Sequence, residues 1–223
     1  MTLDPTAPLV VMPSTASRSP ERVHAARRAA GVSGLVAVAG NVAGVAFLHD
    51  MPSAYRLARL GEWGDAVRAQ PLATTASGVC FAVGLTALAH WVTALGREGG
   101  TPRARLGAWF AAATALLDGA GTLLPILPAV GLGAPLPLLH ASLALDALFN
   151  LGLGVGLLAI GADLRERPLL RGLCIAAGLA SVPVSAQAFY DPAANLLAFA
   201  APLWLSLLAV TGVGWLRARR PRG

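Results

Sequence analysis

The stretch that decides the fold is a pair of apolar segments, RLGAWFAAATALLDGAGTLLPIL at Arg105–Leu127 and PLLHASLALDALFNLGLGVGLLAI at Pro137–Ile160, joined by a short linker over residues 128–135. Each segment exceeds the ~20 apolar residues that an α-helix needs to cross ~30 Å of hydrocarbon. Each also carries one carboxylate near its middle, Asp118 and Asp146. Because ionisable groups are costly inside a bilayer and usually have a purpose there, this predicted helical hairpin organises our interpretation of the chain.

The composition indicates the same class of protein. The chain has 223 residues, of which 56% are hydrophobic and only 13% are charged. A soluble protein of this length needs more polar surface to cover its core. Four further apolar segments have a similar length, at residues 29–49, 71–95, 169–190 and 194–216. We therefore predict an all-α fold, a polytopic integral membrane bundle of six transmembrane helices.

The predicted bundle forms one domain over residues 22–216. Residues 1–21 are rich in Pro, Ser, Thr and Ala, which predicts a disordered N-terminal tail. Residues 217–223 are a basic tail that contains four arginines. The three short-looped hairpins leave no room for a second domain.

The arginines predict the orientation in the membrane. All 17 basic residues are Arg. Fourteen of them lie in the two tails and in the connections after the second and fourth spans, whereas three follow the first span. Positively charged connections face the cytoplasm, so we expect both termini in the cytoplasm of a bacterial inner membrane.

The basic residues exclude nucleic acid as a partner and one class of cofactor. The arginines lie at the ends of apolar segments and form no stripe with interleaved aromatic residues, so we expect no nucleic-acid binding. The chain contains no Lys, which rules out cofactors held as a Schiff base. The predicted partner is the lipid bilayer, with a second copy of the chain or another subunit of a membrane complex as alternatives.

The connection at residues 50–70 has an amphipathic pattern. Tyr55, Leu57, Leu60, Trp63 and Val67 recur at intervals of two to four residues, and charged residues occupy the other side. This pattern predicts a helix that lies in the extracytoplasmic interface. A lid over a central cavity is the alternative interpretation.

Polar residues of the hairpin predict a centre near the membrane midplane. Ser142, Asp146 and Asn150 follow an i, i+4, i+8 spacing, so they share one helical face. In an antiparallel hairpin Asp118 lies level with about residue 146, and Asn41 of the first span has a similar depth. Two close carboxylates are expected to share a proton, which suits a proton relay, a cation site or a general acid. The alternative is structural, with these groups hydrogen-bonded to hold the helices together.

Two other polar residues, His140 and Gln187, are weaker candidates. His140 lies near the outer end of the fourth span, and His90 lies near the cytoplasmic end of the second. They therefore lie at opposite membrane faces, and we predict neither a metal site nor a bound cofactor. Gln187 follows Pro183, where its amide is expected to satisfy a carbonyl freed by a kink.

The sequence Gly31-Val32-Ser33-Gly34 matches the Gly-x-Ser-Gly motif of intramembrane serine proteases. Its serine lies at the cytoplasmic start of the first span. We expect no catalytic role, because no histidine of a neighbouring span is clearly placed at that depth to act as a base.

Small residues predict where helices approach one another closely. They are Gly40 and Gly44 in the first span, Gly152, Gly154 and Gly156 in the fourth, and Gly172 and Gly178 in the fifth.

The order of features resembles a large, uncharacterised family of six-span bacterial membrane proteins known only as a domain of unknown function. The similar features run from Arg27-Arg28-x-x-Gly31 through a polar segment ending near Pro71 to a closing span at Pro202–Leu216. Between them lie His140–Gly161, Arg165–Arg171 and Leu173–Ser185. The resemblance implies the six-span fold and carries no activity or catalytic residues.

The sequence thus favours a small transporter-like or accessory membrane protein with a mid-membrane carboxylate centre. A membrane enzyme that acts on a lipid or isoprenoid substrate, with one Asp as general acid, is the first alternative. A structural subunit of a membrane complex is the second. Carboxylates that line a connected cavity would support transport or catalysis, whereas carboxylates packed against neighbours would favour a structural role.

Overall fold

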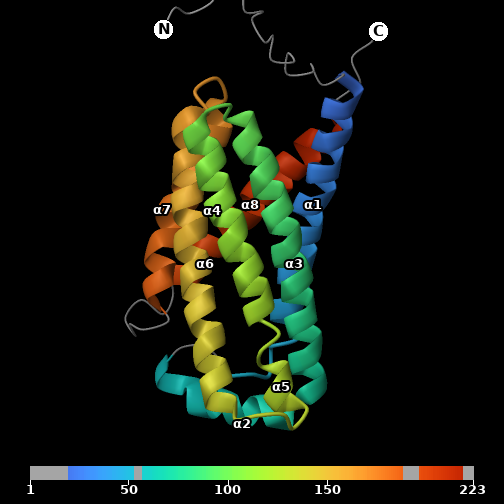
Figure 1. The fold of residues 1–223 in the computed structure, drawn as a ribbon, viewed down its shortest axis with the longest axis vertical. Helices are drawn as coiled ribbons and strands as arrows, with labels where there is room; N and C mark the ends of the chain where they lie inside the picture. Colours follow the sequence, from blue (N-terminus) through green and yellow to red (C-terminus); the bar gives the residue numbers. More distant parts are fainter. Residues whose placement is uncertain (1–19, 53–56, 188–195, 218–223) are drawn as a thin grey trace, which may run out of the picture.

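The computed structural model describes residues 20–52, 57–187 and 196–217, and all regular structure in these residues is helical (Figure 1). The long helices are α1 (Pro20–Ala46), α3 (Pro71–Glu98), α4 (Pro102–Gly121), α6 (Pro135–Asp163), α7 (Pro168–Gln187) and α8 (Leu196–Arg217). Three short helices complete the described part, η1 (Leu57–Arg59), α2 (Leu60–Ala69) and α5 (Ile126–Ala129). Six helical segments are long and apolar enough to cross a membrane, which confirms the predicted fold class.

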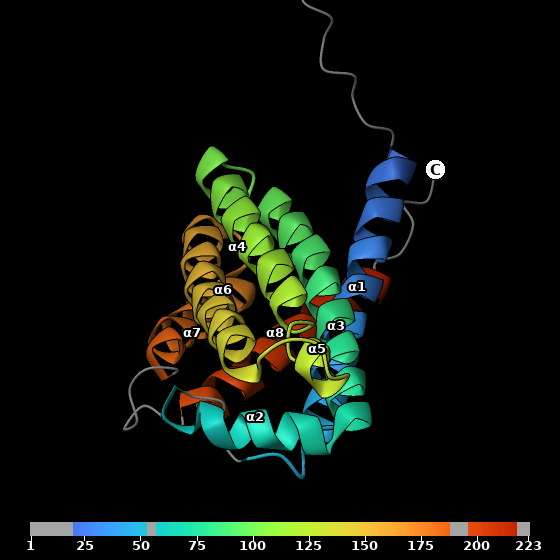
Figure 2. The same ribbon diagram turned by 60° about the horizontal axis from the view of Figure 1, so that its bottom comes forward.

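The long helices pack as a closed ring. Each helix contacts its neighbour in the order α1, α3, α4, α6, α7, α8, and α8 returns to α1. The first described residues of α1 and the last of α8 lie at one end of the bundle, and α2 and α5 cover the opposite end (Figures 1 and 2). We call these the terminal end and the α2 end.

The outside of the bundle differs from that of a soluble protein, whereas its inside is an ordinary apolar core. All six long helices contribute to one apolar core, in which Trp91 and Leu153 are almost fully buried. The outside also carries large apolar side chains, such as Leu72 with 85% of its surface exposed and Leu106 with 73%. Such exposure suits contact with lipid and is unfavourable in water, so the bundle is that of a multi-pass membrane protein.

The third span was predicted as one helix over residues 105–127, but it is interrupted. Helix α4 ends at Gly121, a turn follows, and α5 begins at Ile126. Pro125 is the cause, because proline lacks a backbone N–H and disfavours helical geometry in the residue before it. The break begins only a few residues after Asp118.

Other helix ends differ from the predicted spans by smaller amounts. Helix α1 begins at Pro20, well before the predicted start at residue 29, because Ala and Arg favour helix beyond the apolar run and proline suits the first turn. Helix α6 begins at Pro135, directly after a turn in which Gly131 and Gly133 have positive φ. The predicted disordered tail lies mostly outside the described residues.

The predicted interfacial helix over residues 50–70 is shorter than expected. Only α2 and the short η1 turn are helical in its described part, and Tyr55 lies outside the described residues. Leu60 and Val67 of α2 pack with Leu139 of α6, and each is about 1% exposed or less. Helix α2 lies across the ends of the long helices (Figure 2). Its place at a membrane interface stays a prediction.

Most of the predicted glycine contacts are present. A Cβ atom on Gly156 would lie 2.6 Å from both the Ala111 Cβ and the Gly107 backbone oxygen, so α4 and α6 touch there. The remaining close approaches join Gly40 to Gly84, Gly44 to Phe81, Gly152 to Thr114, and Gly154 to Gly178. Gly172 is the exception, since a Cβ there would have no neighbour within 4 Å. The closing pair of the ring, Gly31 and Gly212, was not among the predicted contacts.

These contacts predict the effect of adding one methyl group. Gly156→Ala forces α4 and α6 apart and is expected to destabilise the protein by about 1–3 kcal/mol, the usual cost of overpacking. The matched control is Gly172→Ala, which meets open space and gains helix propensity, so its stability is expected to stay equal or to rise by up to about 1 kcal/mol. Unfolding of the purified protein in detergent measures both. Equal losses in the two variants would contradict the assigned contacts.

Candidate functional site

The packing of α4 on α6 sets the position of the carboxylate pair. Thr114 lies against Gly152, and Gly121 lies against Leu145. The two helices run in opposite directions, so Asp118 is level with about residue 148, between Asp146 and Asn150. This level is close to the middle of α6, which spans Pro135–Asp163. The hairpin therefore brings Asp118 to the depth of Asp146 and Asn150, as the sequence predicts.

The centre contains buried oxygen atoms without a hydrogen-bond partner. Asp118 is 3% exposed and Asn150 is 2% exposed. The Oδ1 atoms of both residues are buried and accept no hydrogen bond from any described group. The Asn150 amide nitrogen donates to the backbone oxygen of Asp146 at 2.9 Å. The carboxyl groups of Asp118 and Asp146 are close enough to interact electrostatically.

The end of α4 adds a second electrostatic influence on Asp118. This residue lies in the last turn of α4, where the helix dipole places partial negative charge. Thr122 caps this end: its backbone N–H donates to the Asp118 backbone oxygen at 2.8 Å, and its hydroxyl donates to the Gly119 oxygen at 2.9 Å. The backbone is satisfied, but the carboxyl group is not. Such a site favours a carboxyl group that has bound a proton or a cation over a carboxylate that has bound neither.

The other predicted members of the centre occupy different positions. Ser142 is 4% exposed and lies one turn before Asp146 on α6. Asn41 packs at Gly84 on α3, and its amide donates to the Ala37 oxygen at 2.8 Å. Because α3 lies between α1 and α4 in the ring, Asn41 contacts α3 and not the carboxylate pair.

Two secondary candidates lie outside the centre. His140 is exposed, and its Nδ1 atom lies 2.7 Å from the Leu136 backbone oxygen within the same helix. Gln187 ends α7, and its side chain lies outside the described residues.

The serine motif has a histidine neighbour that the sequence interpretation missed. The Ser33 hydroxyl lies 2.8 Å from Nδ1 of His90 on α3, and also 3.1 Å from the Ala29 backbone oxygen. The expectation that no histidine is placed beside this serine is therefore wrong. It failed because the rotation of α1 against α3, set by Gly40 and Gly84, is not encoded in either span alone.

The pair nevertheless lacks another part of a serine hydrolase. Ser33 lies in the interior of α1, where backbone N–H groups are engaged in helical hydrogen bonds. A serine nucleophile needs free donors beside it to bind the oxyanion. The contact is thus an interhelical hydrogen bond between α1 and α3.

A charged cluster at the terminal end was also missed. Glu98, which is 11% exposed at its side chain, accepts from Arg27 of α1 at 2.7 Å and from Arg167 at 2.9 Å. Nearby, Asp163 accepts from Arg103 and from the Thr101 hydroxyl. These bonds tie α1, α3, α4, α6 and the connection to α7 together. The sequence signal was present, because Glu98 and Asp163 are acids that lie close to the arginines of this end.

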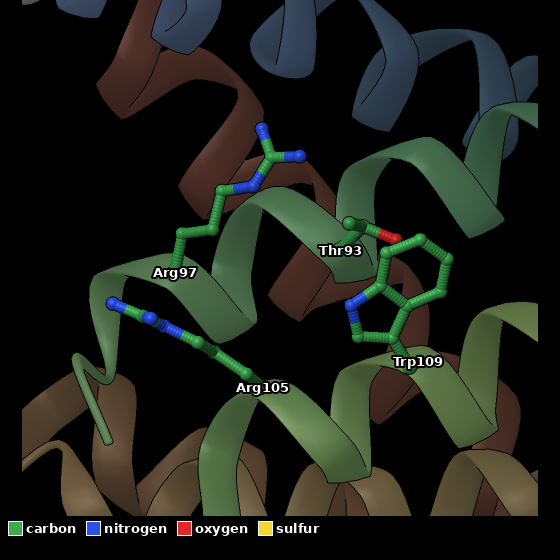
Figure 3. Close-up of a pocket in the computed structure, with 4 residues that line it drawn as sticks. All are labelled: Thr93, Arg97, Arg105 and Trp109. Atoms are coloured by element: carbon green, nitrogen blue, oxygen red, sulfur yellow. The ribbon is translucent and has the colours of Figure 1, made fainter. Parts of the chain in front are cut away.

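Two cavities of about 370 Å³ lie elsewhere in the described part of the protein. One is a groove between α3 and α4 at the terminal end, lined by Thr93, Arg97, Arg105 and Trp109 (Figure 3). The other lies between α7 and α8 and is mostly apolar. Neither cavity is lined by Asp118 or Asp146.

Comparison of the chain with protein-family models, curated proteins and solved structures found no match. Within the described ranges, no three side chains of His, Cys, Asp or Glu gather as metal ligands do. Chemical inference about this protein therefore rests on its own residues, above all on Asp118, Asp146 and Asn150.

The Glu98 cluster yields a stability prediction. Glu98→Gln leaves two arginines without their shared carboxylate and is expected to destabilise the protein by about 1–2 kcal/mol, a value reduced from that of a fully buried pair because both arginines are half-exposed. The measurement is detergent unfolding at low and high salt.

The matched control for this prediction is Glu62→Gln on α2. Glu62 lies 2.5 Å from Arg59, whose guanidinium holds the pKa of the Glu62 carboxyl below its usual range. This pair is exposed to solvent, so its loss is expected to leave stability unchanged. A Glu98 variant as stable as the Glu62 variant would show that the cluster does not tie the helices together.

Proposed function

We propose that this chain is a transporter-like multi-pass protein of a bacterial inner membrane in which Asp118 and Asp146 bind and release a proton. The observation that carries the proposal is the buried Oδ1 of Asp118, which has no hydrogen-bond partner among the described residues. An unsatisfied carboxylate oxygen inside a membrane bundle is costly. A bound proton removes that cost.

Three features act together on this carboxyl group. It is 3% exposed, it lies close enough to the carboxyl group of Asp146 to interact with it electrostatically, and it lies at the negative end of α4. Each feature disfavours a second negative charge. One shared proton neutralises the pair, and the buried oxygen of Asn150 is an acceptor for a protonated carboxyl group at the same level.

The distribution of arginines supports the proposed orientation. Of the arginines in the described residues, ten lie at the terminal end of the bundle and only Arg59 and Arg68 lie at the α2 end. By the positive-inside tendency, the terminal end faces the cytoplasm and α2 lies at the outer interface. The resemblance to an uncharacterised six-span family remains a prediction.

A structural subunit is the second candidate, and one observation favours it. Asp118 is packed between helices, and neither cavity reaches it. A protein that only holds partners together needs no access to its buried groups. The enzyme alternative has less support, since a general acid must touch its substrate and Asp118 is almost fully buried.

Infrared spectroscopy tests proton binding directly. In lipid vesicles, the full-length protein is expected to show a protonated carboxyl band that shifts on exchange into D₂O and changes with pH. Asp118→Asn and Asp146→Asn are each expected to abolish or shift this band. Asp65→Asn is the matched control, because Asp65 is exposed on α2, and it should leave the band unchanged.

A second measurement separates transport from a structural role. Proton flux into vesicles that contain a pH-sensitive dye is compared for the same variants. Transport predicts flux in the wild-type protein that both Asn variants lose while they remain folded. Folded wild-type protein without flux, together with an unaltered band in both variants, would leave the structural candidate as the function.

A further inference from the structure

The groove between α3 and α4 brings two arginines together. Arg97 lies in the last turn of α3, and Arg105 lies in the first turns of α4. Figure 3 shows the Arg105 side chain extending toward α3 and the Trp109 ring lying beside Thr93. The cavity between them has a volume of about 370 Å³, which is large enough for a phosphate group and part of a headgroup.

A close backbone contact creates this arrangement. Gly96 packs directly on α4, and a Cβ atom there would lie 2.9 Å from the Ala104 backbone oxygen. The helices therefore approach with only the Ala108 methyl group between them. Arg97 and Arg105, each next in sequence to a residue of this contact, are thereby held at the same level.

The positive charge of the groove is not paired with a carboxylate in the part of the chain that the structure describes. Two acids at this end already form ion pairs with other arginines: Glu98 pairs with Arg27 and Arg167, and Asp163 pairs with Arg103. In the described part of the chain, neither Arg97 nor Arg105 forms an ion pair. Figure 3 shows the Arg97 guanidinium pointing away from Arg105. Both side chains are long and can rotate, so an anion bound in the groove would draw both guanidinium groups toward it.

The surface next to the arginines is apolar and exposed. Trp109 is 65% exposed, Leu106 is 73% exposed and Phe110 is 43% exposed. Trp109 lies about one turn deeper in α4 than Arg105, the level at which tryptophan marks the boundary between headgroups and hydrocarbon. Cations above an exposed apolar surface match the two halves of a phospholipid.

We propose that this groove binds one anionic phospholipid, whose phosphate lies between Arg97 and Arg105 and whose acyl chains lie along Trp109 and the exposed face of α4. Basic sites at the cytoplasmic side of membrane helices favour anionic headgroups. Arginine suits the phosphate because its donors form paired hydrogen bonds with two oxygens. The proposal requires the position in the membrane and does not depend on proton binding by Asp118.

The test uses the full chain in detergent with added lipid. Thermal stability and native mass spectrometry are compared for phosphatidylglycerol, phosphatidylcholine and inorganic phosphate. Phosphatidylglycerol is expected to stabilise the wild-type protein and to remain bound to it, and phosphatidylcholine much less so. In Arg97→Gln/Arg105→Gln the affinity for phosphatidylglycerol is expected to fall about tenfold or more.

Two further variants keep the test falsifiable. Arg22→Gln/Arg28→Gln removes two exposed arginines of α1 at the same end and should retain the lipid preference. Arg97→Lys/Arg105→Lys keeps the charge but loses the paired hydrogen bonds, so its affinity is expected to lie between those of the wild-type protein and the Gln variant, which separates loss of binding from loss of fold.

Three outcomes would overturn the proposal. The first is equal loss in the Arg22 and Arg28 control, which indicates diffuse attraction to the whole basic end. The second is stabilisation by inorganic phosphate alone to the same extent as by phosphatidylglycerol, which indicates a site for a free anion. The third is absence of any preference for the anionic lipid in the wild-type protein.

Discussion

The close contact between α4 and α6 is the constraint on which the rest of the arrangement depends. Gly152 and Gly156 place no side chain of α6 in this contact, so the side chains of Thr114 and Ala111 lie against the backbone of α6. This contact fixes both the rotation and the axial register of the two helices. The register in turn places Asp118 level with Asp146 and Asn150.

Much of the fold could be predicted because membrane helices follow simple rules of length and polarity. A long apolar run predicts a helix, and a short connection predicts an antiparallel neighbour, so the hairpin was predictable from its own residues. The depth of the aspartates was predictable for the same reason. The break after Gly121 was not, because hydropathy continues through Leu123 and Leu124 while the backbone cannot continue through Pro125.

Contacts between helices that are distant in sequence were harder to predict. The hydrogen bond between Ser33 and His90 depends on how α1 is rotated against α3, and Glu98 has partners on α1 and on the connection before α7. Hydropathy carries no information about rotation. Small residues carry some information about rotation. Gly172 nevertheless faces open space, although a glycine in a predicted span suggested a helix contact. Predicting which side chains meet between distant helices therefore requires the arrangement of the whole ring.

The ring is closed by helices from the two extremes of the chain, and this has a consequence for synthesis. Gly31 of α1 packs on Gly212 of α8, so about 170 residues must be made after α1 before its partner exists. At ~5–20 residues per second, translation alone takes roughly ten to thirty seconds. During that interval α1 stands in the bilayer with one packing face unoccupied. The first helix to enter the membrane is thus among the last to complete its contacts, and the surrounding lipid or an insertion factor must cover that face in the meantime.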